Sequence, residues 1–264
     1  MSVKNLETII YTKTDRIAEI RFNRPHRLNA VVEQLYKDVL TCIDNAEQDN
    51  TISVILIRGE GRAFCVGADM KEHDSGERSL DQKRAYLLLA NNVCQRIFEC
   101  QKPIIAAVNG YALGAGAEMA VAADFLLMAE SAQIGFPEIS IGTFLGGGVS
   151  YILPKLVGLA QARRLIFSGA RIQGQEAKNI GLAVNVFADE EFTSGVAAFA
   201  NLIGSKAPVS MRLAKQQLNT SAGTGFHGCL TRELEGIITC MQTADWQEGV
   251  DAFAEKREPV FKGE

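Results

Sequence analysis

The chain has 264 residues, of which 47% are hydrophobic and 22% charged, so it is long enough to bury a sizeable core as one domain. Its formal net charge of −4 argues against nucleic acid or an anionic membrane as a bulk electrostatic partner. No apolar run reaches the roughly 18 residues of a transmembrane helix, and residues 1–14 carry no signal-peptide pattern, so we expect a cytoplasmic protein.

Cysteine and histidine spacing predicts neither a disulfide framework nor a metal site. The six cysteines form no CxxC pair, which favours free thiols in a reducing compartment. His26, His73 and His227 are isolated along the chain and lack the spacing of metal ligands.

The first half of the chain alternates strands and helices. In chain order, the pattern predicts a hairpin over 8–22, a turn over 23–29, a helix over 32–43, strands over 53–58 and 63–65, a charged mobile loop over 71–82 and a helix over 80–100.

The second half continues this order and ends in helices. The pattern predicts a strand over 104–108, a helix over 116–123, strands over 125–129 and 133–136, helices over 146–157, 160–167 and 173–180, a strand over 181–186, and helices from 190 onward, broken at 207–208 and 221–225. The class is therefore α/β with a C-terminal helical region.

Two acidic segments point to a reaction. Residues 102–118 read as a buried strand, a glycine-rich turn and the start of a helix that carries Glu118. Residues 136–142 place Glu138 directly after a proline, twenty positions further on. Two carboxylates beside small residues with free backbone N–H groups suggest acid/base chemistry next to an oxyanion site.

Five motifs occur in order along nearly the whole chain, within residues 23–30, 63–71, 102–118, 136–142 and 248–257. Together they resemble the enoyl-CoA hydratase/isomerase family, also called the crotonase superfamily. The resemblance implies a spiral of repeated ββα units over residues 1–200 that holds an acyl-CoA site. It implies a C-terminal α-helical trimerisation region over residues 201–264, which also contacts CoA, and assembly as a homotrimer or a dimer of trimers.

The resemblance also implies the site residues. Glu118 and Glu138 match the two catalytic glutamates, and the N–H groups of Ala68 and Ala115 match the two donors of the oxyanion hole. Ala115 stands where the family often has glycine, and Gly146 matches a backbone position near the reacting water. Which glutamate is the acid and which the base is left open.

Four further positions match contacts to coenzyme A, which is part of the substrate, so no separate cofactor is expected. Arg24 and Lys71 match the nucleotide side, and Phe253 and Lys256 match tail positions that often act across a subunit boundary. We expect the acyl pocket to be lined from the 70–90 region, Phe144, Leu145 and the C-terminal helices, and the sequence leaves the acyl group open.

Three other functions remain as alternatives. A double-bond isomerase of the same fold is the nearest, but such enzymes often keep only the second glutamate, so Glu118 favours hydration. A dinucleotide-binding oxidoreductase would use Gly114 and Gly116, but the third glycine of that fingerprint is replaced by Met119. An RNA-binding module would need a basic helix face, whereas the charged side chains of residues 33–50 are all acidic except Lys37.

Overall fold

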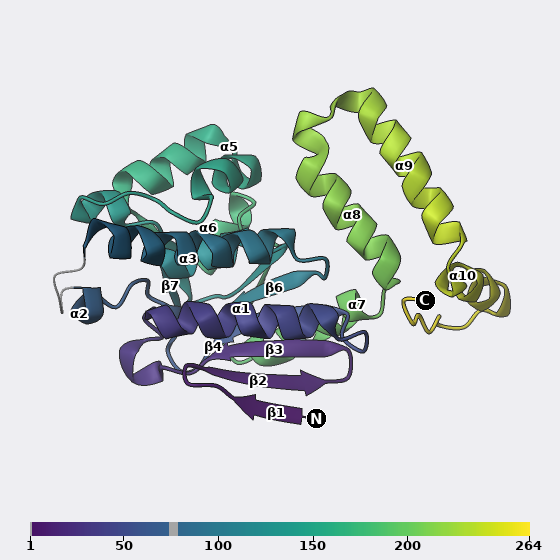
Figure 1. The fold of residues 1–264 in the computed structure, drawn as a ribbon, viewed down its shortest axis with the longest axis horizontal. Helices are drawn as coiled ribbons and strands as arrows, with labels where there is room; N and C mark the ends of the chain where they lie inside the picture. The colour runs from purple at the N-terminus through teal and green to yellow at the C-terminus, as the bar shows by residue number, and fades with distance from the viewer. Residues whose placement is uncertain (1, 74–78) are drawn as a thin grey trace.

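The computed structural model describes residues 2–73 and 79–264 (Figure 1). The helix α2 (Met70–His73) occupies the start of the segment predicted as a mobile loop. Residues 74–78 of that predicted loop lie outside the described residues.

A seven-stranded sheet forms the centre of the fold. Its strand order is β1 (Ser2–Asn5), β2 (Ile9–Thr14), β3 (Ile17–Phe22), β4 (Val54–Gly59), β6 (Ile104–Val108), β8 (Phe125–Ala129) and β11 (Asn185–Phe187). β1 to β3 are antiparallel, and the strands from β3 to β11 are parallel. Every residue of β6 is buried, as is typical of a parallel strand covered on both faces.

A smaller sheet of four strands lies beside it. Its order is β10 (Arg171–Gln173), β9 (Gln133–Gly135), β7 (Tyr111–Leu113) and β5 (Ala63–Cys65). Successive strands of the chain, β4 and β5, β6 and β7, or β8 and β9, therefore belong to different sheets, and a helix follows each pair. This repeat of two strands and a helix is the spiral that the sequence predicted.

Helices cover the sheets and connect the repeats. They are α1 (Glu33–Gln48), α3 (Leu80–Glu99), α4 (Ala115–Ala122), α5 (Val149–Ser168), α6 (Gly174–Asn179) and α7 (Phe192–Gly204), with short 3₁₀ helices η1 (Pro25–Arg27) and η2 (Glu138–Ile141). α3 begins with a capping box formed by Ser79 and Gln82. Gly158, with φ of 75° and ψ of 157°, kinks α5 where the sequence predicted a stop between two helices.

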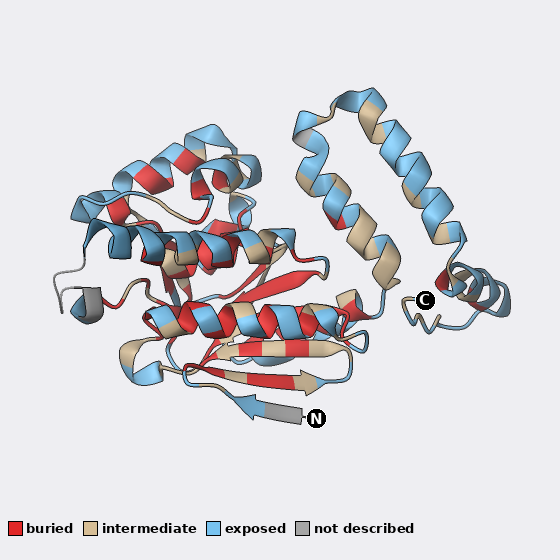
Figure 2. Cartoon of the chain, viewed as in Figure 1, coloured by how far each residue is buried: buried red, intermediate tan, exposed pale blue. Residues whose placement is uncertain are grey.

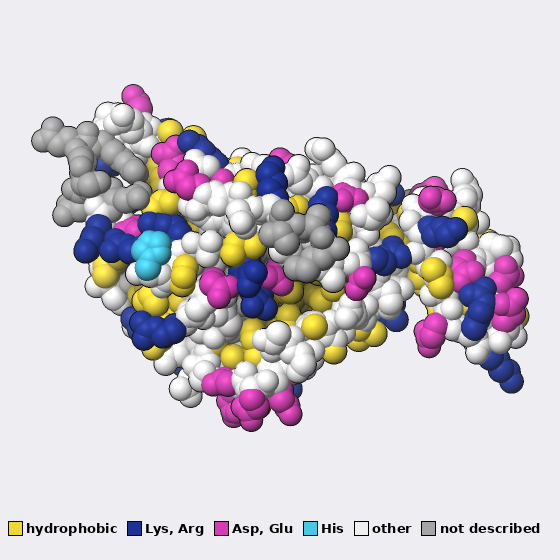
Figure 3. Space-filling model, turned by 90° about the horizontal axis from the view of Figure 1, so that it is seen from below, with side chains coloured by type: hydrophobic (Ala, Val, Ile, Leu, Met, Phe, Trp, Pro, Cys, Tyr) yellow, Lys and Arg dark blue, Asp and Glu magenta, His cyan; other side chains and the backbone are white. Residues whose placement is uncertain are grey.

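Three helices extend from the core to one side: α8 (Pro208–Thr220), α9 (Gly225–Met241), which follows the 3₁₀ turn η3 (Ser221–Gly223), and α10 (Ala244–Glu255). They end in a separate lobe, and most of their surface is exposed (Figures 1, 2 and 3). Exposed apolar side chains are frequent on them, including Leu218, Leu230, Leu234, Ile237, Met241, Trp246 and Phe253. The predicted helical region is thus present, and its role in assembly stays a prediction.

A buried ion pair holds α8 against the core. The ammonium of Lys215 lies 2.7 Å from a carboxylate oxygen of Asp124, which also accepts a 2.7 Å hydrogen bond from the N–H of Ile104. Lys215 also donates to the backbone oxygen of Ile97, in the last turn of α3, and to that of Lys102, just after the helix ends. A cation is favoured there because the carbonyl groups that end a helix carry partial negative charge.

The structure adds three strands that the sequence did not predict, β1, β7 and β10. It also shortens the predicted 181–186 strand to β11, at residues 185–187. β1 and β10 are edge strands of four and three residues without an apolar alternation, so only their pairing to β2 and β9 identifies them. β7 lies inside the smaller sheet, in the segment that the sequence predicted as a glycine-rich turn. All six cysteines are free, and Cys42, Cys65, Cys94 and Cys100 are buried. Within the part of the chain that the structure describes, no helix combines the length and apolar character needed to cross a bilayer.

Candidate active site

Glu118 lies in the first turn of α4, a helix that is buried on almost every side. The preceding Gly114 has φ of 53° and ψ of −127°, a conformation that only glycine adopts without strain, so the chain can turn sharply from β7 into α4. A carboxylate oxygen of Glu118, Oε1, accepts a 2.8 Å hydrogen bond from the N–H of Gly146. Burial raises the pKa of Glu118 to about 7, the Gly146 N–H offsets part of this rise, and the charge of Glu138 adds to it.

Glu138 begins η2, directly after the Phe136–Pro137 step that follows β9. It is buried, and neither carboxylate oxygen has a hydrogen-bond partner on another described residue. Burial raises its pKa, which its own backbone N–H partly offsets. A methyl group at Gly114 would come within 3.2 Å of Glu138 Oε1, so Glu138 points at the turn that leads to Glu118. The two carboxyl groups therefore share one buried site.

A glycine loop (residues 146–148) closes one side of this site. A Cβ atom at Gly146 would lie 3.0 Å from Glu118 Oε2. A Cβ atom at Gly147 would lie 2.7 Å from the sulfur of Cys94 and 2.9 Å from Glu118 Cβ. A side chain at Gly146 or Gly147 would therefore displace Glu118, whereas Gly148 is favoured by its positive φ of 78°.

Two loop backbones that carry the predicted oxyanion donors pack directly against each other. A Cβ atom at Gly67, whose φ is 90°, would lie 2.9 Å from the carbonyl oxygen of Leu113 and 3.5 Å from the nitrogen of Ala115. Ala115 is the first residue of α4, where backbone N–H groups have no partner within the helix.

Ala68 forms an isolated parallel bridge with Val31, through the carbonyl of Gly67 and the N–H of Asp69. Since N–H groups alternate in direction along extended chain, the N–H of Ala68 points away from Val31. The Ala68–Val31 bridge therefore does not use the N–H of Ala68, and the hydrogen bonds within α4 do not use the N–H of Ala115.

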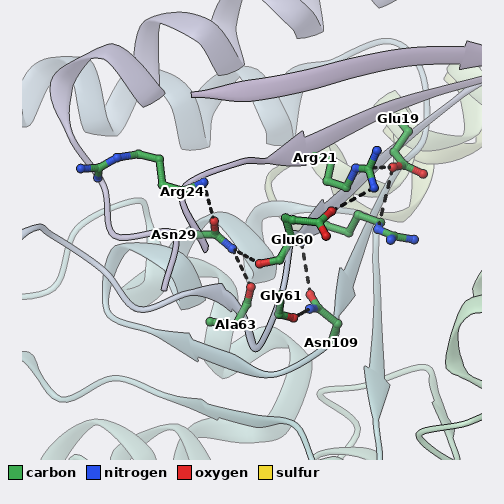
Figure 4. A network of polar contacts seen from close by, with 10 residues as sticks. Glu19, Arg21, Arg24, Asn29, Glu60, Gly61, Ala63 and Asn109 are labelled. Carbon is green, nitrogen blue, oxygen red and sulfur yellow. Dashed lines mark hydrogen bonds and ion pairs between the residues drawn. The ribbon is translucent and has the colours of Figure 1, made fainter. Parts of the chain in front are cut away.

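Sequence reasoning missed the residue that holds the strand leading to Ala68. Asn29 is fully buried, and its side-chain NH₂ donates to the carbonyl oxygens of Ala63 at 2.7 Å and Glu60 at 3.0 Å (Figure 4). Its side-chain oxygen accepts a 2.9 Å hydrogen bond from the N–H of Arg24. Asn29 thereby ties the turn after β3 to the turn between β4 and β5. Its only signal in the sequence was its place in the 23–30 motif.

The predicted CoA contacts fall into two separate places. Arg24 lies 3.3 Å from the buried Asp69, which also pairs with Arg27 at 2.7 Å, and the exposed Lys71 donates its backbone N–H to the same carboxylate. Arg27, as the largest cause, and Arg24 lower the pKa of Asp69. Basic side chains gather at this end of the molecule (Figure 3).

Phe253 and Lys256 lie elsewhere, in α10 and at its C-terminal cap, at the opposite end of the chain from α2 (Figure 1). Phe253 is 88% exposed. The structure therefore brings Arg24 and Lys71 together within one chain, but not Phe253 or Lys256 with them.

A cavity of about 360 Å³ adjoins the glycine loop. It is lined by Asn91, Cys94, Gln95 and Phe98 of α3, by Leu145 and the glycine loop, and by Ser150, Tyr151 and Ile152 of α5. Leu145 lines this cavity. Phe144 is 77% exposed and, like the C-terminal helices, does not line this cavity.

Comparisons with known proteins cover nearly the whole chain. The sequence profile described as enoyl-CoA hydratase/isomerase matches residues 12–264. A short-chain-enoyl-CoA hydratase from Clostridium acetobutylicum is 34% identical over 96% of this chain and 96% of its own length. A 2,3-dehydroadipyl-CoA hydratase from Escherichia coli is 33% identical over 98% of this chain and 100% of its own.

A crystal structure of an enoyl-CoA hydratase from Bacillus anthracis superimposes with a TM-score of 0.93 at 32% identity, covering 98% of this chain and 100% of that one. Family profile, relatives and structural neighbour all span nearly the whole chain. The chain therefore belongs to the enoyl-CoA hydratase/isomerase family.

Proposed function

We propose that this protein is an enoyl-CoA hydratase, which adds water across the 2,3 double bond of an α,β-unsaturated acyl-CoA or catalyses the reverse dehydration. One observation carries the proposal: two buried glutamates share a site in which Gly146 fixes Glu118 and no other described residue donates a hydrogen bond to the carboxylate of Glu138. Unpaired buried carboxyl groups with raised pKa values are costly for folding and are characteristic of acid/base sites. The names of the relatives support hydration.

Glu118 is the proposed base and Glu138 the proposed acid. The Gly146 N–H stabilises the ionised form of Glu118 and leaves its Oε2 for a water molecule. Burial raises the pKa of Glu138 and favours its protonated form, and among the described residues its own backbone N–H is the donor that opposes this rise. Glu118 takes a proton from water as the water oxygen bonds to C3, and the π electrons move to the thioester oxygen. Glu138 then gives its proton to C2.

The N–H groups of Ala68 and Ala115 are the proposed donors to the thioester oxygen as negative charge develops on it. Their backbones are packed together before substrate arrives, so little reorganisation is needed during the reaction. Ala115 also lies at the N-terminus of α4, whose dipole favours negative charge. Losing one such donor costs about 2.7–4 kcal/mol of barrier.

The cavity beside the glycine loop is the proposed acyl pocket, and the basic end around Arg24 and Lys71 is the proposed site of the CoA nucleotide. Phe253 and Lys256 belong to α10 and its C-terminal cap, at the other end of the molecule from α2, so we propose that they serve a neighbouring subunit (Figure 1). A homotrimer or a dimer of trimers is the proposed assembly, and the exposed apolar faces of α8 and α9, which border a groove of about 1050 Å³, support it.

Hydration of crotonyl-CoA tests the proposal, and the loss of absorbance of the conjugated thioester measures it. Glu118→Gln and Glu138→Gln should each lower turnover about 10²- to 10⁴-fold, because each removes a proton-transfer step, while binding of the CoA ester survives. Near-normal turnover in both variants would refute the assignment. Because Glu118 must be ionised to act as the base, turnover should fall as the pH drops below about 7, roughly tenfold per pH unit.

An isomerase of the same family is the second candidate. Moving a double bond from C3–C4 to C2–C3 takes a proton from C2 and returns one to C4 without water, so a single carboxyl group can suffice. The placement of both Glu118 and Glu138 in one buried site favours hydration. Isomerisation of a 3-enoyl-CoA, with no water addition to any 2-enoyl-CoA in a panel of chain lengths, would decide for the isomerase.

A further inference from the structure

We propose that Asn91 is a positioning residue for the hydration reaction, which sets the place of Glu118 through the glycine loop. The inference rests on the proposed function above. Asn91 is in α3 and touches neither Glu118 nor, in the scheme above, the reacting atoms. It acts on the next residue of the loop, Gly147, and thereby on the Gly146 amide that holds Glu118.

The contact that carries the inference is a 3.2 Å hydrogen bond from the N–H of Gly147 to Oδ1 of Asn91. Since a backbone N–H only donates, the side-chain oxygen of Asn91, and not its NH₂ group, must face Gly147. The adjacent N–H, that of Gly146, makes the 2.8 Å hydrogen bond to Glu118 Oε1. Two consecutive amides of one loop are thus held by α3 and by the proposed base.

A second contact from α3 fixes the same loop. Cys94 is one helical turn after Asn91, and its sulfur would lie only 2.7 Å from a Cβ atom at Gly147. Gly147 is therefore packed between Cys94 and the Cβ atom of Glu118, while Asn91 binds its amide. Packing limits how close the loop comes to α3, and the hydrogen bond prevents its rotation or withdrawal.

The remaining groups around Glu118 cannot replace this control near neutral pH. Among the described residues, the titratable groups coupled to Glu118 are Glu138, Cys94, Cys65 and Tyr36. Burial raises the pKa of both thiols and of the phenol, that of Cys65 to about 12, so all three stay neutral. Burial has the largest effect on the pKa of Glu118, and the Gly146 amide is the hydrogen-bond donor that opposes it and that a loop displacement would weaken.

Asn91→Leu removes the acceptor at nearly constant shape, and Asn92→Leu is the matched control. Asn92 is the next residue of α3 and is exposed like Asn91, but it does not line the cavity. We expect Asn91→Leu to lower kcat about tenfold, the loss typical of one hydrogen bond, with KM changed less than threefold. Because the Gly146 amide stabilises ionised Glu118, a displaced loop should also move the acidic limb of the kcat profile to higher pH.

Asn91→Asp keeps an acceptor oxygen of the same reach. Above the pKa of Glu118 it should retain turnover within about threefold of the wild type. Carboxyl ¹³C NMR of the glutamates, assigned with Glu118→Gln, should show a higher pKa for Glu118 in Asn91→Leu than in Asn92→Leu. This measurement needs no turnover, so it tests the positioning role even if the protein does not hydrate enoyl-CoA esters.

Equal Glu118 titration and equal pH profiles in Asn91→Leu and Asn92→Leu would overturn the inference. So would a change confined to KM, which would make Asn91 only part of the acyl pocket. A tenfold loss of turnover together with a lower melting temperature and an unshifted pH profile would also overturn it, since that pattern reports a structural role alone.

Discussion

Glu118→Gln should make this protein more stable while it removes activity. In the folded chain burial raises the pKa of Glu118 from 4.5 to about 7, whereas the unfolded chain keeps the ordinary value. The folded state therefore binds more protons between these two pKa values. The contribution of Glu118 to the free energy of unfolding is fully present below about pH 4.5 and is lost as the pH rises through about 7.

The structure sets the size of the effect. A rise of this size corresponds to about 3 kcal/mol of lost stability once Glu118 is ionised, since one pH unit is worth about 1.4 kcal/mol. Glutamine has the same shape, carries no charge and can still accept the Gly146 N–H. Its gain is smaller than the full 3 kcal/mol, because a neutral acceptor makes the weaker hydrogen bond.

Urea unfolding at about pH 5.5 and pH 8.5, at equal protein concentration, measures this. The advantage of Glu118→Gln over the wild type should increase by about 2 kcal/mol between the two pH values, because ionisation of the folded wild type becomes complete only above pH 7. Glu190→Gln is the control, since Glu190 is exposed and should show no such increase. If the stability advantage of Glu118→Gln increases with pH no more than that of Glu190→Gln, burial does not raise the pKa of Glu118 and the reasoning is refuted.

Two further substitutions test the backbone turn and the attachment of α8. Gly114→Ala should cost about 1–3 kcal/mol of stability from its positive φ and also lower turnover more than tenfold, because its methyl group lies 3.2 Å from Glu138 Oε1. Gly158→Ala has a positive φ with nothing within 4 Å of the new methyl, so equal turnover in the two variants would contradict this. Lys215→Met should destabilise by about 3 kcal/mol by leaving Asp124 unpaired, and hydrogen exchange in α8 should rise; unchanged exchange would show that apolar packing alone holds α8.

The sequence determined most elements of this fold because its periodicity reflects burial. The continuous apolar run at 104–108 could only be a strand covered on both faces, and structure places it in the middle of the sheet as β6. Gly158 interrupted the helical pattern, and it kinks α5 through a positive φ. These features depend on neighbours along the chain, so local sequence specifies them.

Local sequence did not determine β1 and β10. Each of them is a strand only because an edge of a sheet is free beside it, and that depends on where distant segments have folded. The same applies to Lys215, which reads as an ordinary charge on an amphipathic helix. Only the docking of α8 places it against Asp124 and the end of α3.

At the candidate site, the sequence by itself determined residue types: two glutamates, a run of glycines and small residues around the expected donors. The tertiary structure decided which groups control them. Gly146 binds Glu118, Asn29 holds the strand before Ala68, and Asn91 holds the glycine loop, each across at least 28 positions of chain. Pairings at that separation leave no periodic pattern, because a hydrogen bond between distant segments depends on the packing of whole elements and constrains a single side chain in each.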